Sequence, residues 1–251
     1  MAGSALYGTA AGYSTATSGT VFAISTNGTG FTTIHAFNGN DGGVPKGSLI
    51  LSGNVLYGTT EDGGPASQGT IFAVTTNGSA FTNLYTFPYG TEGSNPEAGL
   101  ALLGNTLYGT TRIYSNVVNG TIFSVNVDGT GLNYIHDFGV TKGDGIIPLS
   151  SMFLSGNVLY GTAYDDGPYG SAGGVVYSLT IPVPPTLSIN SLETNVVLTW
   201  TNSGALYYLQ SSTNLSGGVW TTVSNAPAAT NGLTAWTNST SAPTLFFRLS
   251  P

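Results

Sequence analysis

The tetrapeptide Leu-Tyr-Gly-Thr occurs four times, about 50 residues apart, and this repetition limits the fold more than any other feature of the chain. The copies begin at Leu6, Leu56, Leu107 and Leu159. A second motif follows in register, Gly-Thr-Val/Ile-Phe in the first three copies and Gly-Val-Val-Tyr in the fourth. One structural unit is therefore copied along residues 1–181, and we place its copies at about 1–40, 41–90, 91–141 and 142–181.

The second copy is the best-formed unit and predicts four β-strands. Its strand-like segments are Ser48–Leu51, Val55–Thr60, Gly69–Val74 and Phe81–Phe87. The turns at Gly53-Asn54 and Asn77-Gly78 favour tight antiparallel hairpins, because these residues tolerate positive φ angles. The 37 glycines, and the lack of a long helix-favouring stretch, also argue against helices. The sequence predicts an all-β chain built from four-stranded antiparallel meanders.

The predicted strands carry bulky apolar residues on both faces. Leu56 and Tyr57 are adjacent, as are Ile71 and Phe72, and successive strand residues point to opposite faces. A sheet with two apolar faces needs a neighbour on each side. Sheets of this size stacked around an axis are the blades of a β-propeller, so we expect a propeller-like array. We expect the glycine of each Leu-Tyr-Gly-Thr strand to occupy a crowded position near that axis.

The first and last copies are incomplete. Met1 aligns with Leu51, so the first copy lacks its opening strand. In the fourth copy Ile181-Pro182-Val183-Pro184-Pro185 replaces the last hairpin. We therefore predict three, four, four and three strands, in an array of about four blades that either closes as a small ring or is part of a larger one. The missing strand favours a truncated chain, and the incomplete blade edges favour self-association.

The sequence pattern changes after a proline-rich linker at residues 182–186. Residues 187–251 contain short apolar segments about ten residues apart, the spacing of a small β-sandwich of the fibronectin-III or immunoglobulin type. The expected strands are Leu187–Ile189, Val196–Trp200, Leu206–Gln210, Val219–Val223, Leu233–Trp236 and Leu245–Leu249.

The composition excludes several classes of partner. Charged residues make up 6% of the chain, against about 25% in an ordinary soluble domain. The net charge is −7, and four scattered Lys and Arg residues cannot line a phosphate-binding groove. We therefore expect no nucleic acid partner. No apolar run approaches the roughly 20 residues that span a bilayer, so we expect no membrane insertion, and any export signal would lie outside this chain.

The repeat resembles the Gloeo/Verruco (GloVer) tandem repeat. The matching text is GNVLYGTT…GTIFAVTTNGSAFTNLYTF at Gly53–Phe87 together with its three relatives, over about residues 1–181. The tail VVLTWTNSGALYYLQSSTNLSGGVWTTV…FFRLSP resembles the fibronectin-III-like module that often ends such proteins. The resemblance implies a bacterial exported or cell-surface protein with a C-terminal anchoring segment. The family has no established activity that the resemblance could assign to residues of this chain. No sorting helix or basic tail follows Phe247-Arg248-Leu249-Ser250-Pro251, which departs from the anchored pattern.

The two histidines occupy the same position of their repeats. His35 and His136 are replaced by Tyr85 in the second copy. A position that accepts His or Tyr is typical of packing or hydrogen bonding at a blade edge rather than of catalysis. We therefore assign no catalytic residue.

Adjacent carboxylates occur in two matching loops, at Glu61-Asp62 and Asp165-Asp166. Such pairs could bind calcium or serve as the acid and base of a glycosidase. The surrounding Asp-Gly and Gly-Pro pairs are also ordinary turn chemistry, and the ligand spacing of a dedicated calcium loop is missing. A further acidic series, Asp41, Glu92 and Asp144, recurs at each blade-to-blade crossing and indicates structural turns. We expect no metal or cofactor, with calcium as the alternative.

The loops that follow each Leu-Tyr-Gly-Thr strand differ between copies, as ligand-binding loops on a rigid scaffold do. The candidate ligand-binding residues are Tyr13, Asp62, Arg112, Tyr114, Tyr164, Asp165, Asp166 and Tyr169. We expect a non-enzymatic, extracellular or cell-surface binding or scaffold module whose loops contact a glycan or a protein. The alternative is a glycoside hydrolase that uses the loop carboxylates.

Overall fold

A computed structural model describes residues 5–14, 17–89, 93–112, 119–141, 143–166, 173–182, 186–192, 195–201, 208–214, 219–223, 228–230, 233–239 and 245–250. The chain divides into two compact units, residues 1–180 and 181–251. The described residues form strands and no helix, so the all-β prediction is confirmed. None of them therefore lies in a helix long and apolar enough to cross a bilayer.

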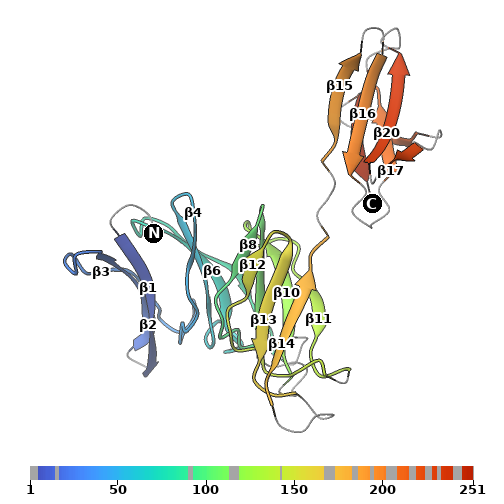
Figure 1. Cartoon of the computed structure of the whole chain (residues 1–251). Coiled ribbons are helices and arrows are strands. Elements are labelled where there is room, and N and C mark those ends of the chain that lie inside the picture. Colours follow the sequence, from blue (N-terminus) through green and yellow to red (C-terminus); the bar gives the residue numbers. More distant parts are fainter. Residues whose placement is uncertain are drawn as a thin grey trace. The chain divides into compact units, whose positions relative to one another are not determined.

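The first unit consists of four small antiparallel sheets that follow one another along the chain (Figure 1). The first sheet contains β1 (Ala5–Ser14), β2 (Thr17–Ser25) and β3 (Thr32–Ala36). The second contains β4 (Ile50–Ser52), β5 (Val55–Thr60), β6 (Thr70–Thr75) and β7 (Phe81–Thr86). The third contains β8 (Ala101–Leu103), β9 (Thr106–Thr111), β10 (Thr121–Asn126) and β11 (Asn133–Asp137). The fourth contains β12 (Phe153–Ser155), β13 (Val158–Ala163) and β14 (Val175–Thr180). In each sheet the strands pair in chain order, with the expected three, four, four and three strands.

The sheets of the first unit pack face to face. We call the face that carries the Tyr of Leu-Tyr-Gly-Thr the forward face of a sheet, and the face that carries the Leu its backward face. The forward face of the first sheet and the backward face of the second share one buried core, formed by Val21, Phe37, Leu56, Phe72 and Val74. The second and third sheets share another, formed by Tyr57, Ile71, Phe87, Leu100, Leu107, Phe123 and Val125. Adjacent strand residues thus enter different cores, as the doubly apolar pattern predicts.

An aromatic ring crosses the glycine of each Leu-Tyr-Gly-Thr strand. Gly58 pairs directly with Phe72 on the neighbouring strand β6. A Cβ added to Gly58 would lie 2.6 Å from Cζ of Phe72 and 2.8 Å from Cδ2 of Leu49. Gly109 has the same relation to Phe123, where the distance from the added Cβ to Cζ is 2.4 Å. The glycine is therefore required because a cross-strand ring covers it, which is a more local cause than the crowding at an axis that the sequence suggested.

The threonine of each Leu-Tyr-Gly-Thr strand fastens its sheet to the next one. The Thr59 hydroxyl donates a 2.8 Å hydrogen bond to the carbonyl of Ala98, and Thr110 donates a 3.0 Å bond to Pro148. In the first sheet Thr9 donates in the same way to Gly47 at 3.0 Å. Each acceptor lies in the segment where the chain enters the following sheet. The repeat thus encodes both the apolar core and the polar clamp between sheets.

A second set of hydrogen bonds between sheets is made by a residue with a positive φ angle at each crossing from one sheet to the next. Val44, Asn95 and Ile147 have φ angles of 54°, 55° and 58°. Asparagine tolerates such angles, but the β-branched Val44 and Ile147 rarely adopt them. The amide of Val44 donates to the Ser18 carbonyl of the preceding sheet at 2.7 Å, and its carbonyl accepts from Glu61 of its own sheet at 3.2 Å. The recurrence of these paired bonds at the equivalent positions explains how the strained conformation is held.

Small residues allow three sheets to meet at one point. Ser48, Gly99 and Ser151 are equivalent positions of the second, third and fourth sheets. The Ser151 hydroxyl accepts a 2.9 Å hydrogen bond from the Gly99 amide and lies 3.3 Å from the Ser48 hydroxyl. A Cβ on Gly99 would come within 2.3 Å of the Ser48 oxygen, so only glycine fits there. The second and fourth sheets therefore make direct contact across the third.

Tyr13 was expected in a loop but lies in strand β1, and this expectation is wrong. β1 continues to Ser14, which pairs with Thr17 after a register shift. The matching loop of the second sheet contains Gly63-Gly64-Pro65, whereas the first has short Ala, Ser and Thr residues that can extend the ladder. The side chain of Tyr13 is outside the described residues.

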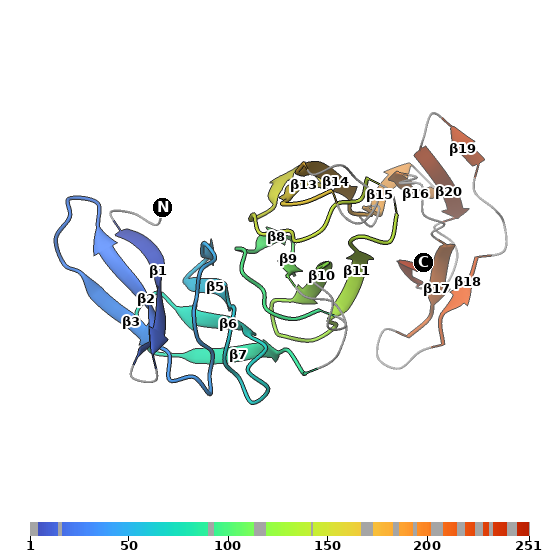
Figure 2. The same cartoon turned by 90° about the horizontal axis from the view of Figure 1, so that it is seen from below.

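The second unit contains two antiparallel sheets (Figure 2). One is formed by β15 (Ser188–Leu192), β16 (Asn195–Thr201), β20 (Leu233–Ser239) and β19 (Ala228–Thr230). The other is formed by β18 (Thr221–Thr222), β17 (Tyr208–Ser212) and β21 (Phe246–Ser250). The rings of Trp236 and Phe247 connect the two sheets at 5.3 Å. The sequence predicts six of these strands and misses β19, because Ala-Ala-Thr has no apolar alternation.

Gly58→Ala should lower the free energy of unfolding of the first unit by about 1–3 kcal/mol, because the added methyl group collides with Phe72 and Leu49. Urea unfolding followed by circular dichroism measures the change. Gly173→Ala is the matched control, since nothing lies within 4 Å of its added Cβ, and it should stay within about 0.5 kcal/mol. Tryptophan fluorescence should be unaffected, because all three tryptophans lie in the second unit, at Trp200, Trp220 and Trp236. Equal stability of the two variants would contradict this role of glycine.

Tyr177→Phe should increase the free energy of unfolding by about 1 kcal/mol, because an unpaired buried hydroxyl is costly. Among the described residues the Tyr177 hydroxyl is buried without a hydrogen-bond partner, and burial raises its pKa. The other three copies have Phe at this position. Tyr160→Phe, which removes a hydroxyl from a more exposed side chain, should change nothing in the same urea titration. A destabilised Tyr177→Phe protein would indicate a hydrogen bond instead.

Candidate functional site

Four charged side chains form a cluster at the corners of the second and third sheets. The Lys46 ammonium lies 2.6 Å from Glu61 and 3.0 Å from Glu97. The Arg112 guanidinium lies 3.1 Å from Glu97 and 3.9 Å from Glu61. The chain has only four Lys and Arg residues, and two of them are here. Half of the basic side chains of the chain are therefore gathered at one place.

The cluster is made by register-equivalent residues that differ between copies. Lys46 and Glu97 each follow the proline of a crossing, and Glu61 and Arg112 each follow a Leu-Tyr-Gly-Thr-Thr strand. Neighbouring copies thus carry opposite charges at the same backbone position. A common backbone frame with different side chains is how repeat proteins build binding surfaces.

The charged cluster shifts the pKa values of Glu61 and Lys46 for different reasons. Burial raises the pKa of Glu61 and the negative charge of Glu97 adds to this, while the hydrogen bond from Lys46 acts in the opposite direction. For Lys46, burial lowers the pKa, but hydrogen bonds to Glu61 and Glu97 and their charges outweigh it, so its pKa is raised. The site therefore stabilises the charged lysine and disfavours the charged form of Glu61. Because the ion pairs are partly exposed, each contributes only about 0–1 kcal/mol.

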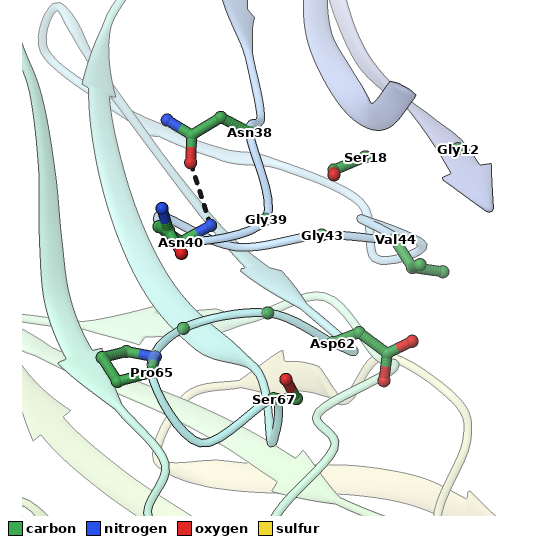
Figure 3. Close-up of a pocket in the computed structure, with 12 residues that line it drawn as sticks. Gly12, Ser18, Asn38, Gly39, Asn40, Gly43, Val44, Asp62, Pro65 and Ser67 are labelled. Carbon is green, nitrogen blue, oxygen red and sulfur yellow. Dashed lines mark hydrogen bonds between the residues drawn. The ribbon is translucent and has the colours of Figure 1, made fainter. Parts of the chain in front are cut away.

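A pocket of about 710 Å³ lies between the loops of the first and second sheets (Figure 3). Residues 38–44 line one side, and residues 62–67 line the other. The polar residues that line the pocket are Ser18, Asn38, Asn40, Asp62 and Ser67. Glycines make up much of the remaining lining, so main-chain groups also face the space. The result is a polar pocket without an aromatic wall among its described lining residues.

Close backbone contact makes the pocket floor rigid. A Cβ on Gly63 would lie 2.4 Å from the carbonyl carbon of Gly42, so the two loops touch through their main chains. The Gly64 amide donates to the Gly39 carbonyl at 2.9 Å, and Gly43 and Asp62 form an antiparallel bridge. The Asn38 side-chain oxygen accepts a 2.9 Å hydrogen bond from the amide of Asn40 (Figure 3) and a 3.3 Å bond from the amide of Asp41. Asn40 and Asp62 lie on this frame with exposed side chains.

The structure separates the residues that the sequence grouped as ligand-binding. Asp62 lines the pocket and accepts a 3.4 Å hydrogen bond from the Asn95 amide group, and Arg112 belongs to the charged cluster. Tyr164 is exposed beyond strand β13, where Asp165 and Asp166 follow it half-buried. Tyr114, Tyr169 and the side chain of Tyr13 lie outside the described residues.

Asp62 and Asp165 have the same backbone role in their sheets. Asp62 bridges Gly43, and Asp165 bridges Ile146, each as an isolated antiparallel pair. These contacts agree with the turn function that the Asp-Gly pattern indicates. The side chains of the two residues belong to different sheets, and only Asp62 lines the pocket.

Both histidines pair with acidic residues of the crossing turns. His35 Nε2 lies 3.1 Å from Asp41, and His136 Nε2 lies 2.7 Å from Asp144. The His35 ring also stacks on Phe81 of the next sheet, with ring centroids 3.7 Å apart. These contacts are the packing and hydrogen bonding that the repeat pattern indicates. The sequence treated the histidines and the acidic turns as separate features, and the structure joins them.

Within the described part of the chain, no three His, Asp or Glu side chains are grouped closely enough to hold a metal ion. Glu61, one of the carboxylates considered for calcium, faces Lys46 and Arg112 instead. The calcium alternative therefore has no supporting geometry among these residues.

Sequence reasoning missed Lys46, Glu97, Asn38 and Asn40. Aligning the copies by position after the crossing proline places Lys46 opposite Glu97, and aligning them after the repeat strand places Glu61 opposite Arg112. Opposite charges at equivalent positions of neighbouring sheets are a signal that could have located the cluster. Nothing in the sequence marks Asn40, because asparagine is common in turns.

Stacked antiparallel sheets copied from one sequence unit, with polar loops at their corners, define a propeller-like repeat protein. The chain belongs to the Gloeobacter/Verrucomicrobia repeat family, whose model matches residues 1–235. The match extends beyond the four copies of the Leu-Tyr-Gly-Thr unit into the second compact unit.

Two solved structures are similar to this chain at low identity. The nidogen/laminin complex contains a chain that is 18% identical, with a TM-score of 0.47 over 79% of this chain and 68% of that one. TolB from Acinetobacter baumannii is 11% identical, with a TM-score of 0.45 over 90% of this chain and 54% of TolB. This chain thus spans about half of the TolB chain. No curated protein matches it.

Glu61→Gln should gain stability relative to the parent protein as the pH rises above 4.5, the ordinary pKa of a glutamate. The raised pKa of Glu61 means that the folded state holds this proton more tightly than the unfolded state does. The parent therefore loses stability as the pH rises through the folded pKa, and the glutamine variant does not. Urea titrations between about pH 4 and pH 7 measure the difference.

Asp128→Asn is the control, because the pKa of Asp128 is shifted in the opposite direction to that of Glu61. Hydrogen bonds from Thr130 lower the pKa of Asp128, so its stabilisation is present at neutral pH and disappears as the pH falls. Because this change lies below the ordinary pKa of 3.8, Asp128→Asn should run parallel to the parent between about pH 4 and pH 7, where only Glu61→Gln should diverge. A flat profile for Glu61→Gln would show that burial does not disfavour its charge.

Proposed function

We propose that this chain is a non-catalytic, exported or cell-surface binding module that recognises a glycan in the pocket between its first two sheets. The observation that carries the proposal is the polar pocket itself, because its side chains are positioned by a rigid main-chain frame. The repeat family supports a repeat scaffold, and the low charge of the chain suits a surface wetted by hydroxyl and amide groups.

The size and lining of the pocket favour a small carbohydrate. Its volume of about 710 Å³ lies within the roughly 300–1,000 Å³ of ordinary ligand pockets. Sugar hydroxyls can donate to the Asp62 carboxylate and can exchange hydrogen bonds with the Asn40 amide and the Ser67 hydroxyl. The charged cluster is built on residues adjacent in sequence to this lining, since Glu61 precedes Asp62. A specific protein partner would need an interface of roughly 1,000 Å² or more, which a pocket of this size does not provide by itself.

We propose binding rather than hydrolysis. Glycoside hydrolysis uses two carboxylates on opposite sides of the scissile bond, about 5–10 Å apart. Among the residues that line the pocket, Asp62 is the one carboxylate. The proposal assigns Asp62 the role of a hydrogen-bond acceptor for a sugar.

Asn40→Ala and Asp62→Ala should each weaken glycan binding by about tenfold or more, because one hydrogen bond, charge-assisted at Asp62, is lost. A glycan array probed with the purified full chain identifies the sugar, and titration calorimetry with that sugar measures the two variants. Asp128→Asn, in a hairpin turn of the third sheet, is the matched control and should bind like the parent.

A blank glycan array would overturn the proposed ligand class, and a protein that binds in a parallel protein array would then replace it. Release of shortened sugars from a bound polysaccharide would overturn the non-catalytic assignment. Retention of full affinity by both alanine variants would place the binding site elsewhere on the chain.

A further inference from the structure

Each internal interface of the first unit joins a forward face to a backward face. The second sheet has both faces covered. Its backward-face residue Leu56 is 1% exposed, and its forward-face residues Tyr57 and Ile71 are 8% and 0% exposed. Equivalent residues of the end sheets can be compared with these values directly, because the backbone positions correspond.

The forward face of the fourth sheet is uncovered. Val176 is 78% exposed, although it is equivalent to the fully buried Ile71. Tyr160, the equivalent of Tyr57, is 43% exposed. Phe153, which corresponds to the partly buried Ile50, is also exposed. Three large apolar side chains thus lie on a face that is a core in the preceding sheets.

The backward face of the first sheet is uncovered as well. Leu6 is 43% exposed, whereas its equivalents Leu56, Leu107 and Leu159 are buried. Phe31 is also exposed and stacks on Phe22 of its own sheet at 5.3 Å. In the second sheet the equivalent ring, Phe81, stacks on His35 of the sheet before it. The first sheet has the same aromatic surface without the preceding ring.

The polar clamp shows the same asymmetry. In the first three sheets the repeat threonine donates its hydroxyl to a carbonyl of the following sheet. Thr162 of the fourth sheet instead donates to the Ser150 hydroxyl of its own sheet at 2.9 Å. The forward face of the fourth sheet thus has the same residues as the preceding sheets, but its threonine bonds within its own sheet.

We propose that the forward face of the fourth sheet binds the backward face of the first sheet of a second copy of this chain, head to tail. The two faces are the complementary halves of an interface that the molecule already forms internally. The described strands of both end sheets carry no Lys, Arg, Asp or Glu, so burying them costs no charge desolvation. The occupant is identified by this complementarity, because each copy supplies the surface that the other lacks.

Such an interface is heterologous, and this property makes it testable. A head-to-tail contact leaves one free face of each kind on a dimer, which then closes as a ring or grows further. A variant damaged at one face can still use the other face. Two variants damaged at different faces should therefore form a single intact interface with each other, which gives a dimer.

Leu6→Asp and Val176→Asp should each raise the dissociation constant for self-association by about tenfold or more, because each places a charge in an apolar interface. Sedimentation equilibrium of the full chain over a range of concentrations measures the mass. The parent should exceed the monomer mass, and each variant alone should be monomeric where the parent is associated. An equimolar mixture of the two variants should form a dimer and nothing larger, since one intact interface remains.

Val140→Asp is the matched control, because Val140 is an exposed valine in the turn after β11, outside the strands of both faces. It should associate like the parent. Circular dichroism should show that all three variants are folded, as the replaced side chains are exposed. A parent that is monomeric at every concentration would overturn the proposal, as would a mixture of variants that stays monomeric. Dimers that survive both substitutions would assign self-association to another surface.

Discussion

The contact between the repeat glycine and the aromatic ring opposite it supports the rest of the first unit. Because Gly58 has no side chain, Phe72 lies across strand β5 and is fully buried between two sheets. Burying such a ring contributes about 1.5–3 kcal/mol, and the third sheet repeats the arrangement with Gly109 and Phe123. Each ring fills the core between its own sheet and the preceding one, and at the same two interfaces the threonine hydroxyls of the preceding sheet bond to the crossing.

The candidate site depends on this regular frame. Left-handed residues at the crossings hold the corner loops against the preceding sheet, so equivalent backbone positions recur with different side chains. Where those side chains are charged, as at Lys46 and Glu97, they form ion pairs across sheets. Where the loops consist largely of glycine, as at Gly39 and Gly63, the main chains approach closely and a polar pocket remains between them. The candidate functional residues therefore lie where the side chains of the copies differ.

The sequence predicted the strands of the repeat well, because alternating apolar pairs and Asn-Gly turns act locally. It placed β5, β6 and β7 almost at their observed bounds. It misplaced Tyr13, where pairing with β2 extends β1, and it missed β19, whose Ala and Thr residues have no local signal. Of the candidate site, Asp62 and Arg112 could be named, but their partners Asn95 and Glu97 could not. The contact of Asp62 with Asn95 crosses from one sheet to the next, and Arg112 meets Glu97 only once the third sheet has folded.

By itself the sequence determined the all-β class, the repeating unit and the two apolar faces of each sheet, because these follow from residue spacing along one strand. Tertiary structure decided which faces are covered. Leu6 and Leu56 occupy the same position of the same motif, yet only Leu56 has a sheet packed against it. It also decided that Lys46 meets Glu97, because the distance between side chains on separate sheets depends on how the sheets stack.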